Sequence, residues 1–142
     1  MSTAPDATVD ALVQLSFAVQ RILATVGAER ELSVVQMRLL GIVRDRRIGM
    51  AELGLHLGLD KSSVTGLVTR AERRGLVQRS PSPDDGRAVH VTLTPLGRDW
   101  TEQGAAEVGA AIGELTARLD ADQRALLTSL AASLVSGRAT PR

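Results

Sequence analysis

The clearest hydrophobic pattern in the chain lies between Asp60 and Arg79, where apolar residues recur at helical spacing. The positions at i, i+3, i+4 and i+7 are Val64, Leu67, Val68 and Ala71. Asp60 can cap this helix, because a short carboxylate accepts the amide hydrogens of a first helical turn. Gly75 can end it, and strand-like alternation follows from Leu76. The pattern therefore predicts a short helix with one buried stripe.

The opposite side of this predicted helix is small, hydroxylated and basic. At about 100° per residue, its positions are Ser62, Gly66, Thr69 and Arg73, with Thr65 and Arg70 beside them. A small polar face can approach a nucleic-acid groove closely, and hydroxyls and arginines bind phosphates and base edges. An ordinary surface helix with a solvated basic face explains the same residues, so this helix alone leaves both interpretations open.

A second short helix is predicted just before the first. Leu53 and Leu57 give residues 50–57 a buried side, and Gly58 stops the helix. Two short helices joined by residues 58–60 have the spacing of a helix-turn-helix, whose second helix enters the major groove of DNA.

The N-terminal third predicts two more helices. Residues 6–26 carry a broad apolar arc, which implies burial against more than one partner surface. The arc consists of Val9, Leu12, Val13, Leu15, Phe17, Val19, Ile22 and Val26. Residues 27–31 break this helix, and Ser33 with Gln36 predicts a capping box for the next. The buried side of that next helix is predicted to comprise Val34, Met37, Leu39, Leu40 and Val43.

After the helix-turn-helix the pattern changes to that of a β-hairpin. Turn-forming residues at 80–87 separate a strand at 76–79 from an alternating strand at 88–93. An arginine beside such a turn, here Arg87, can reach a minor groove, whose negative potential favours it. The alternative is a solvated arginine on a surface hairpin.

Two helices are predicted after the hairpin. Thr94 as N-cap and Pro95 at the first helical position form a strong helix start. Asp120 begins a last helix, which ends near Gly137. Its inward side is predicted to comprise Leu126, Leu127, Leu130 and Leu134. The terminal helices are too apolar on one side to lie alone in water, so we expect them to bury these stripes against a second copy.

Composition and charge narrow the function classes. A chain of 142 residues with 44% hydrophobic and 23% charged residues suits one globular domain. The net charge is only +1, but residues 44–98 hold ten basic and six acidic side chains. A basic middle between mildly acidic ends indicates a face that meets a polyanion.

The sequence gives little support for disulfides, metal binding, catalysis or a membrane segment. The absence of cysteine excludes disulfides and thiolate metal sites, as expected in a reducing cytoplasm. There is no glycine-rich phosphate loop, no HExxH and no Ser/His/acid arrangement, and His56 and His90 fit solvated or packed roles better than catalytic ones. We see no signal peptide, and no uncharged apolar stretch long enough to cross a bilayer. We therefore expect no catalytic residue, no metal and no cofactor.

The order of these predicted elements resembles the MarR family of bacterial transcriptional regulators over nearly the whole chain. The most specific part is Asp85-Gly86-Arg87, which is followed by five residues and then Leu93-Thr94. This looks like the family's D-x-R-x5-L-T pattern. The segment SSVTGLVTRAERRGLVQR, residues 62–79, looks like its recognition helix, and residues 32–40 look like its second helix.

The resemblance implies a mainly α fold with a small β-hairpin wing, a winged helix-turn-helix plus a helical dimerisation region. The single domain would span residues 1–142, with the DNA-binding winged helix at 32–98 and dimerisation helices at 6–27 and 96–137. It implies a homodimer that binds a pseudo-palindromic operator in double-stranded DNA, in the bacterial cytoplasm and on the nucleoid. The predicted DNA-binding residues are Lys61, Ser62, Ser63, Thr65, Gly66, Thr69, Arg70, Arg73, Asp85 and Arg87. In this set Asp85 would help to fix the wing.

The resemblance also implies a small aromatic or anionic effector, because many members bind one between the dimerisation helices and the winged module. Phe17, Arg21 and Arg38 are the predicted ligand-binding residues, although surface positions explain the two arginines better. The leading hypothesis is a homodimeric regulator, expected to repress a nearby operon until a small ligand relieves it. The alternatives are a winged-helix protein-interaction module without DNA binding and a small enzyme. The basic middle of the chain favours the first hypothesis.

Overall fold

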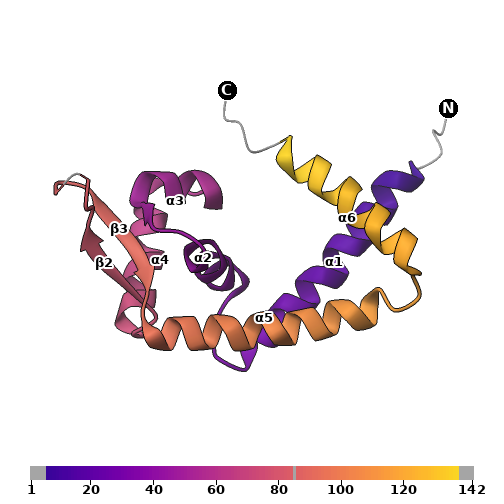
Figure 1. Ribbon diagram of the computed structural model, residues 1–142, viewed down its shortest axis with the longest axis horizontal. Coiled ribbons are helices and arrows are strands. Elements are labelled where there is room, and N and C mark those ends of the chain that lie inside the picture. The colour runs from indigo at the N-terminus through magenta and orange to yellow at the C-terminus, as the bar shows by residue number, and fades with distance from the viewer. Residues whose placement is uncertain (1–5, 85, 138–142) are drawn as a thin grey trace. The chain divides into compact units, whose positions relative to one another are not determined.

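The computed structural model describes residues 6–84 and 86–137. These residues divide into two compact units, with the boundary between Val108 and Gly109. The elements, all labelled in Figure 1 except β1, follow in this order: α1 (Ala7–Ala28), α2 (Val34–Arg44), β1 (Ile48–Gly49), α3 (Met50–Leu57), α4 (Lys61–Arg73), β2 (Val77–Pro81), β3 (Val89–Leu93), α5 (Pro95–Leu115) and α6 (Ala121–Ser136). The second unit holds the end of α5 and all of α6. The expected mainly α fold with a β-hairpin is confirmed.

Local capping signals set where the helices begin. Gln36 N–H donates to Ser33 Oγ over 3.2 Å, and Ser33 N–H donates to Gln36 Oε1 over 2.8 Å. The predicted capping box is therefore present. Asp60 and Thr94 cap α4 and α5 with their side-chain oxygens, and Asp120 caps α6, all as predicted.

The sheet has three antiparallel strands in the order β1-β3-β2. The hairpin of β2 and β3 was predicted from the sequence, but β1 was not, because its segment was assigned to a basic connection. Two residues are too few for an alternation pattern, so only the pairing of Ile48 with Val91 identifies the strand. Of the apolar positions in β3, Val91 and Leu93 are buried, whereas Val89 near the tip is exposed.

The core of the first unit is aliphatic and lies among α2, α3, α4 and the sheet. Its largest fully buried side chains are Leu39, Ile48, Leu53, Val64, Leu67, Val68, Leu76, Val77 and Val91. All four positions predicted for the inner stripe of α4 are buried. Trp100 packs against this cluster from α5. The core therefore holds α4 firmly and leaves its other face to solvent.

The start of α5 lies very close to the start of the hairpin. Gly97 is buried, and a Cβ added there would lie 1.9 Å from the carbonyl oxygen of Leu76. The same carbonyl accepts a hydrogen bond from Thr94 N–H over 3.1 Å. Gly75, predicted as the end of α4, follows the capping residue Arg74 and has a φ of 75°. Only glycine fits without strain at these two positions.

The terminal helices are largely exposed in the single chain. Among the described residues of α1 only Val26 and Gly27 are buried, and Phe17 is 60% exposed. None of the described residues of α6 is buried, and Leu134 is 62% exposed. The expected burial of the α6 leucines against a second copy therefore stays a prediction. Burial of these side chains requires a surface that the single chain does not provide.

By length and composition α1 could cross a membrane, with a mean hydropathy of 1.4. The prediction from the sequence concerned an uncharged stretch of that length, and Asp10 and Arg21 interrupt the apolar run in α1. Core helices of soluble proteins and signal sequences meet the same criterion, so this property is weak evidence.

Candidate nucleic-acid interface

The first turn of α4 is fixed by its N-cap. Asp60 Oδ1 accepts hydrogen bonds from Ser63 N–H over 2.8 Å and from the Ser62 hydroxyl over 2.9 Å. The backbone bond from Ser63, and then the hydroxyl bond from Ser62, lower the pKa of Asp60 below its ordinary value. A charged carboxylate at a helix N-terminus also stabilises the helix dipole. The beginning of α4 is thus held in place while its polar side stays exposed.

The predicted polar face of α4 is accessible to a partner. Its exposed or partly exposed residues are Lys61, Ser62, Ser63, Thr65, Gly66, Thr69, Arg70 and Arg73. The stripe Val64, Leu67, Val68 and Ala71 occupies the core side. The structure thus brings together on one surface all the residues predicted for the helix.

Two hydroxyl groups on this face already use their protons inside the protein. Ser62 donates to Asp60, and Thr65 Oγ1 donates to the Lys61 carbonyl over 2.8 Å. Their lone pairs can accept hydrogen bonds from base amino groups, whereas a bond to phosphate requires release of the internal bond. Thr69 Oγ1 accepts a hydrogen bond from Arg79 Nη2 over 2.8 Å, and this bond does not use the hydroxyl proton of Thr69.

The cations on this face differ in their pairing. In the part of the chain that the structure describes, Lys61, Arg70 and Arg73 form no ion pair. Arg79 lies 4.0 Å from Glu72 and is bonded to Thr69. The three unpaired cations carry the charge that a polyanion would neutralise.

Arg70 lies back along the helix over Gly66. A Cβ built at Gly66 would be 3.2 Å from Arg70 Nη1. The missing side chain of Gly66 therefore leaves room for the guanidinium on the helix surface. A planar guanidinium held there can bond bidentately to a guanine edge or to a phosphate.

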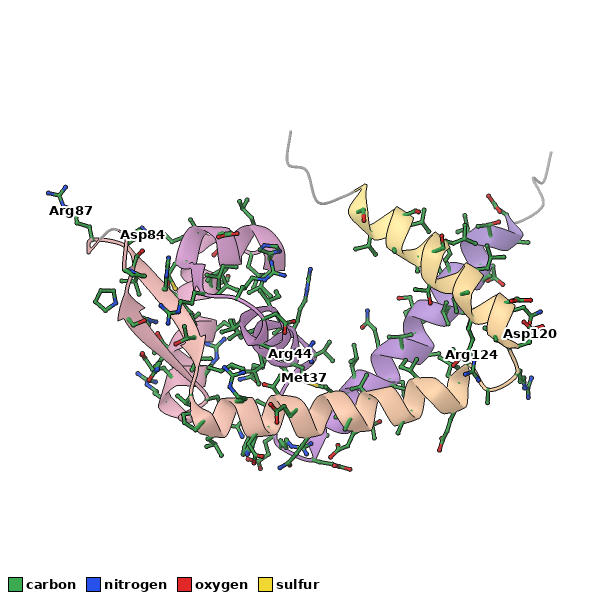
Figure 2. The ribbon with its side chains drawn as sticks, viewed as in Figure 1. Met37, Arg44, Asp84, Arg87, Asp120 and Arg124 are labelled. Carbon is green, nitrogen blue, oxygen red and sulfur yellow. The ribbon has the colours of Figure 1, made fainter. Side chains whose placement is uncertain are left out.

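Arg87 lies at the turned end of the hairpin, and its side chain points away from the sheet (Figure 2). Ser82, which the sequence reading did not single out, is buried at the base of the turn. Its N–H donates to the Ala88 carbonyl over 2.9 Å, and its Oγ accepts from Asp84 N–H over 3.3 Å. Asp85, predicted to help fix the wing, lies outside the described residues.

A groove of about 780 Å³ lies among α3, α4 and the sheet. Lys61, Thr65 and Arg79 contribute its polar lining, and Leu55 is among the apolar residues that line it. The surface between α4 and the wing is therefore concave, as suits a rounded polyanion such as a duplex.

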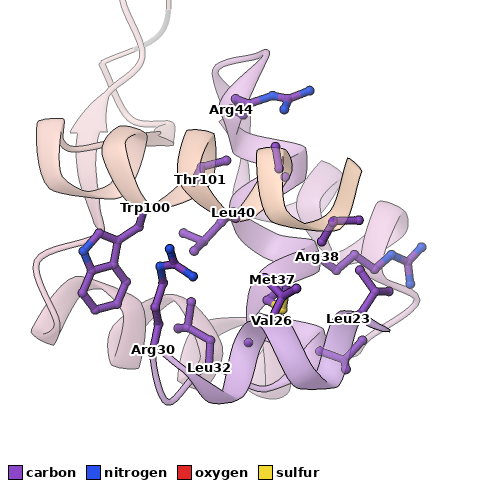
Figure 3. Close-up of a pocket in the computed structure, with 16 residues that line it drawn as sticks. Leu23, Val26, Arg30, Leu32, Met37, Arg38, Leu40, Arg44, Trp100 and Thr101 are labelled. Atoms are coloured by element: carbon purple, nitrogen blue, oxygen red, sulfur yellow. The ribbon is translucent and has the colours of Figure 1, made fainter. Parts of the chain in front are cut away.

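A second cavity, of about 300 Å³, lies among the end of α1, α2 and α5 (Figure 3). Almost all of its wall is apolar, including Leu23, Val26, Met37 and Leu40. Of the residues predicted to bind a ligand, Arg38 lines this cavity. Phe17 and Arg21 do not line it and are exposed on α1.

Arg30, which was not predicted from the sequence, also lines this cavity, and its side chain is only 14% exposed. Its guanidinium donates to both carboxylate oxygens of Glu107, over 2.8 and 3.1 Å, and to Gln103 Oε1 over 3.1 Å. The hydrogen bond raises the pKa of Arg30 and lowers the pKa of Glu107. The two residues are 77 positions apart, so no local pattern could have indicated their contact.

Arg74, the residue after α4, connects that helix to the wall of the cavity. Its guanidinium carbon lies 5.3 Å from the centroid of the Trp100 ring, within the range of a cation–π interaction. It also donates to the backbone carbonyls of Arg30 and Glu31, over 2.6 and 2.8 Å. Arg74 therefore contacts two residues, Trp100 and Arg30, that line the cavity.

The packed α3–α4 pair, the basic exposed face of α4 and the projecting hairpin define a winged helix-turn-helix protein. A sequence profile of the MarR family matches residues 30–88. Residues 30–88 therefore form a winged helix of the MarR family.

Named relatives of this chain are transcriptional regulators. The uncharacterized HTH-type transcriptional regulator YdgJ of Bacillus subtilis is 30% identical over 87 residues, which cover 61% of this chain and 53% of YdgJ. A variant of MarR from E. coli, complexed with operator DNA, has a TM-score of 0.73 at 29% identity and covers 90% of this chain and 94% of its own. CouR from Rhodococcus jostii, bound to p-coumaroyl-CoA, has a TM-score of 0.83 at 25% identity. The match covers 99% of this chain and 98% of the CouR chain. The chain spans about half the length of the curated relatives it matches, but nearly all of these solved structures.

Proposed function

We propose that this protein is a homodimeric, DNA-binding transcriptional regulator that represses a nearby operon until a small effector binds. The observation that carries the proposal is the exposed face of α4. There, Lys61, Arg70 and Arg73 form no ion pair among the described residues, on a helix held by a buried core. The family match and the operator complex of the MarR variant support it. The protein would act in the bacterial cytoplasm, on the nucleoid.

In the proposed complex α4 is the recognition helix. The two α4 helices of a dimer would enter successive major grooves, with half-sites about one turn, ~34 Å, apart. Arg70 would reach a base edge or a phosphate, and Arg87 would enter the adjacent minor groove. The remaining proposed contacts are Lys61, Ser62, Ser63, Thr65, Gly66, Thr69, Arg73 and, in the wing, Asp85.

The apolar cavity is the proposed effector site, and Arg74 is its proposed connection to α4. CouR, whose fold this chain shares, is a family precedent for a bound small molecule. We propose no catalytic role. Among the described residues no group of three or more His, Asp or Glu side chains could hold a metal ion.

A gel-shift assay with the DNA upstream of the protein's own gene tests the proposed function. We expect a complex that survives competition by a duplex of scrambled sequence but dissociates as salt rises, because phosphate neutralisation releases counterions. A folded protein that shifts neither duplex would contradict the proposal. That result would favour the alternative of a protein-interaction module.

Dimerisation is expected because the apolar faces of α1 and α6 are exposed in the single chain. Sedimentation at micromolar concentration should give a mass near twice 15.0 kDa. Leu130→Glu should favour the monomer, since it places a charge on the leucine face of α6. Ala125→Glu adds the same charge to the opposite side of α6 and should remain a dimer. A stable, well-folded wild-type monomer would contradict this prediction.

A further inference from the structure

We propose that the cavity among α1, α2 and α5 selects a neutral, largely apolar molecule and discriminates against carboxylates. The inference rests on the proposed function only in taking this cavity as the effector site. Its volume, about 300 Å³, is at the small end of the usual range for ligand pockets. Burial of apolar ligand surface against its apolar wall supplies the binding free energy.

The charge of Arg30 is already compensated. The guanidinium is bonded to both oxygens of Glu107 and to Gln103. A ligand carboxylate that displaced Glu107 from Arg30 would leave the Glu107 carboxylate without this partner. A ligand carboxylate that left the pair intact would lie desolvated against carbon. Either arrangement costs free energy that a neutral ligand does not lose.

The other two arginines of the lining do not supply a counter-charge inside the cavity. Arg38 Nη2 donates to the His56 carbonyl over 2.7 Å, and Arg44 Nε lies 3.1 Å from Asp45 Oδ1. In Figure 3 their guanidinium groups lie at the edge of the cavity, away from Met37. The aliphatic stems of such side chains cover apolar surface while their charged ends remain in water.

The sole tryptophan of the chain reports binding directly. Trp100 lines the cavity, so its fluorescence measures ligand binding in the absence of DNA. The probes are two matched pairs, methyl benzoate with benzoate and octan-1-ol with octanoate. We expect the neutral member of each pair to bind at least about tenfold more tightly, as follows from the cost of a buried polar group without a partner. Equal or tighter binding of the anions would overturn the proposal, as would no binding by any of the four.

The variant Glu107→Gln tests the stated cause. It keeps the shape of the side chain but removes the charge that compensates Arg30. Benzoate and octanoate should then bind at least about tenfold more tightly, while methyl benzoate and octan-1-ol change little. Glu114→Gln, an exposed position on the same helix, should alter neither. If Glu107→Gln weakened both members of each pair, the role of Glu107 would be structural and the proposal wrong.

The variant Gly104→Leu tests the location. Gly104 lines the cavity, and a Cβ there meets nothing within 4 Å, so a leucine can enter without a backbone clash. We expect this variant to lose at least about tenfold in affinity for the neutral probes, whereas Gly109→Leu, which does not line the cavity, keeps it. Unchanged affinity in Gly104→Leu would place the ligand elsewhere. Ligand binding is measured without DNA and DNA binding without ligand, so failure of this inference and failure of the proposed function are separate results.

Discussion

Arg70→Ala is expected to weaken binding to the specific operator by about 1–3 kcal/mol and to relax the sequence preference at one symmetric position of each half-site. Arg70 lies on the exposed face of α4, above Gly66, and forms no ion pair in the described part of the chain. Its guanidinium can therefore bond bidentately to a guanine edge. Affinity for the operator and for single-substitution operators gives the measurement.

The wing provides the contrast to this prediction. Arg87→Ala should weaken binding to all sequences and flatten the salt dependence by about one unit of slope per subunit, since a minor-groove arginine responds to groove width more than to base identity. Both variants should remain folded dimers, because neither side chain belongs to the buried core. Affinity is measured against salt for the operator and for a random duplex.

Arg118→Ala is the matched control for both arginines. It removes the same charge from an exposed position outside the winged helix and should change neither affinity nor slope. If Arg87→Ala left both affinities and the slope unaltered, the wing would have no contact with DNA. If Arg70→Ala weakened operator and random duplex equally, Arg70 would bind phosphate and would not read a base.

Gly97→Ala is expected to lower the free energy of unfolding by at least about 2 kcal/mol, as for an overpacked core. The added Cβ would lie 1.9 Å from the Leu76 carbonyl oxygen, so backbone must move. That carbonyl also accepts from Thr94 N–H, so the displacement disturbs the start of α5. Denaturant unfolding at one fixed protein concentration gives the measurement, because dimer stability depends on concentration.

Gly113→Ala is the control for this second prediction. It lies on the same helix, and a Cβ there meets nothing within 4 Å. Alanine should stabilise that position by about 0.5–1 kcal/mol, since glycine loses more backbone entropy in a helix. Equal stability of Gly97→Ala and the wild-type protein would mean that α5 can shift away from the hairpin at little cost.

Much of the winged helix was predictable because its signals are local. Asp60 caps α4 through an amide three residues away, and Ser33 and Gln36 form a capping box over the same distance. The α4 stripe repeats within two turns, so one segment contains both its buried and its exposed side. The helix part of the DNA-binding face was therefore identified from a single stretch of sequence.

Contacts between distant segments could not be predicted in this way. β1 has two residues and exists only through its pairing with β3. Arg74 was one of several arginines in a basic segment, and nothing near it in the sequence indicates Trp100 or the Arg30 carbonyl as its partner. Phe17 and Arg21 were predicted beside Arg38 at a ligand site, but the cavity forms around residues from α1, α2 and α5 that include neither.

The sequence by itself determined the helix boundaries, the hairpin and the polar face of α4, because capping bonds and hydrophobic stripes act over a few residues. Only the tertiary structure decided the close approach of Gly97 to Leu76, the pairing of Arg30 with Glu107 and the apolar cavity that Arg30 lines. These features depend on which side chains meet after the chain has folded. The packing of α5 on the winged helix brings these side chains together, and local helix or strand propensity does not determine which residues come into contact.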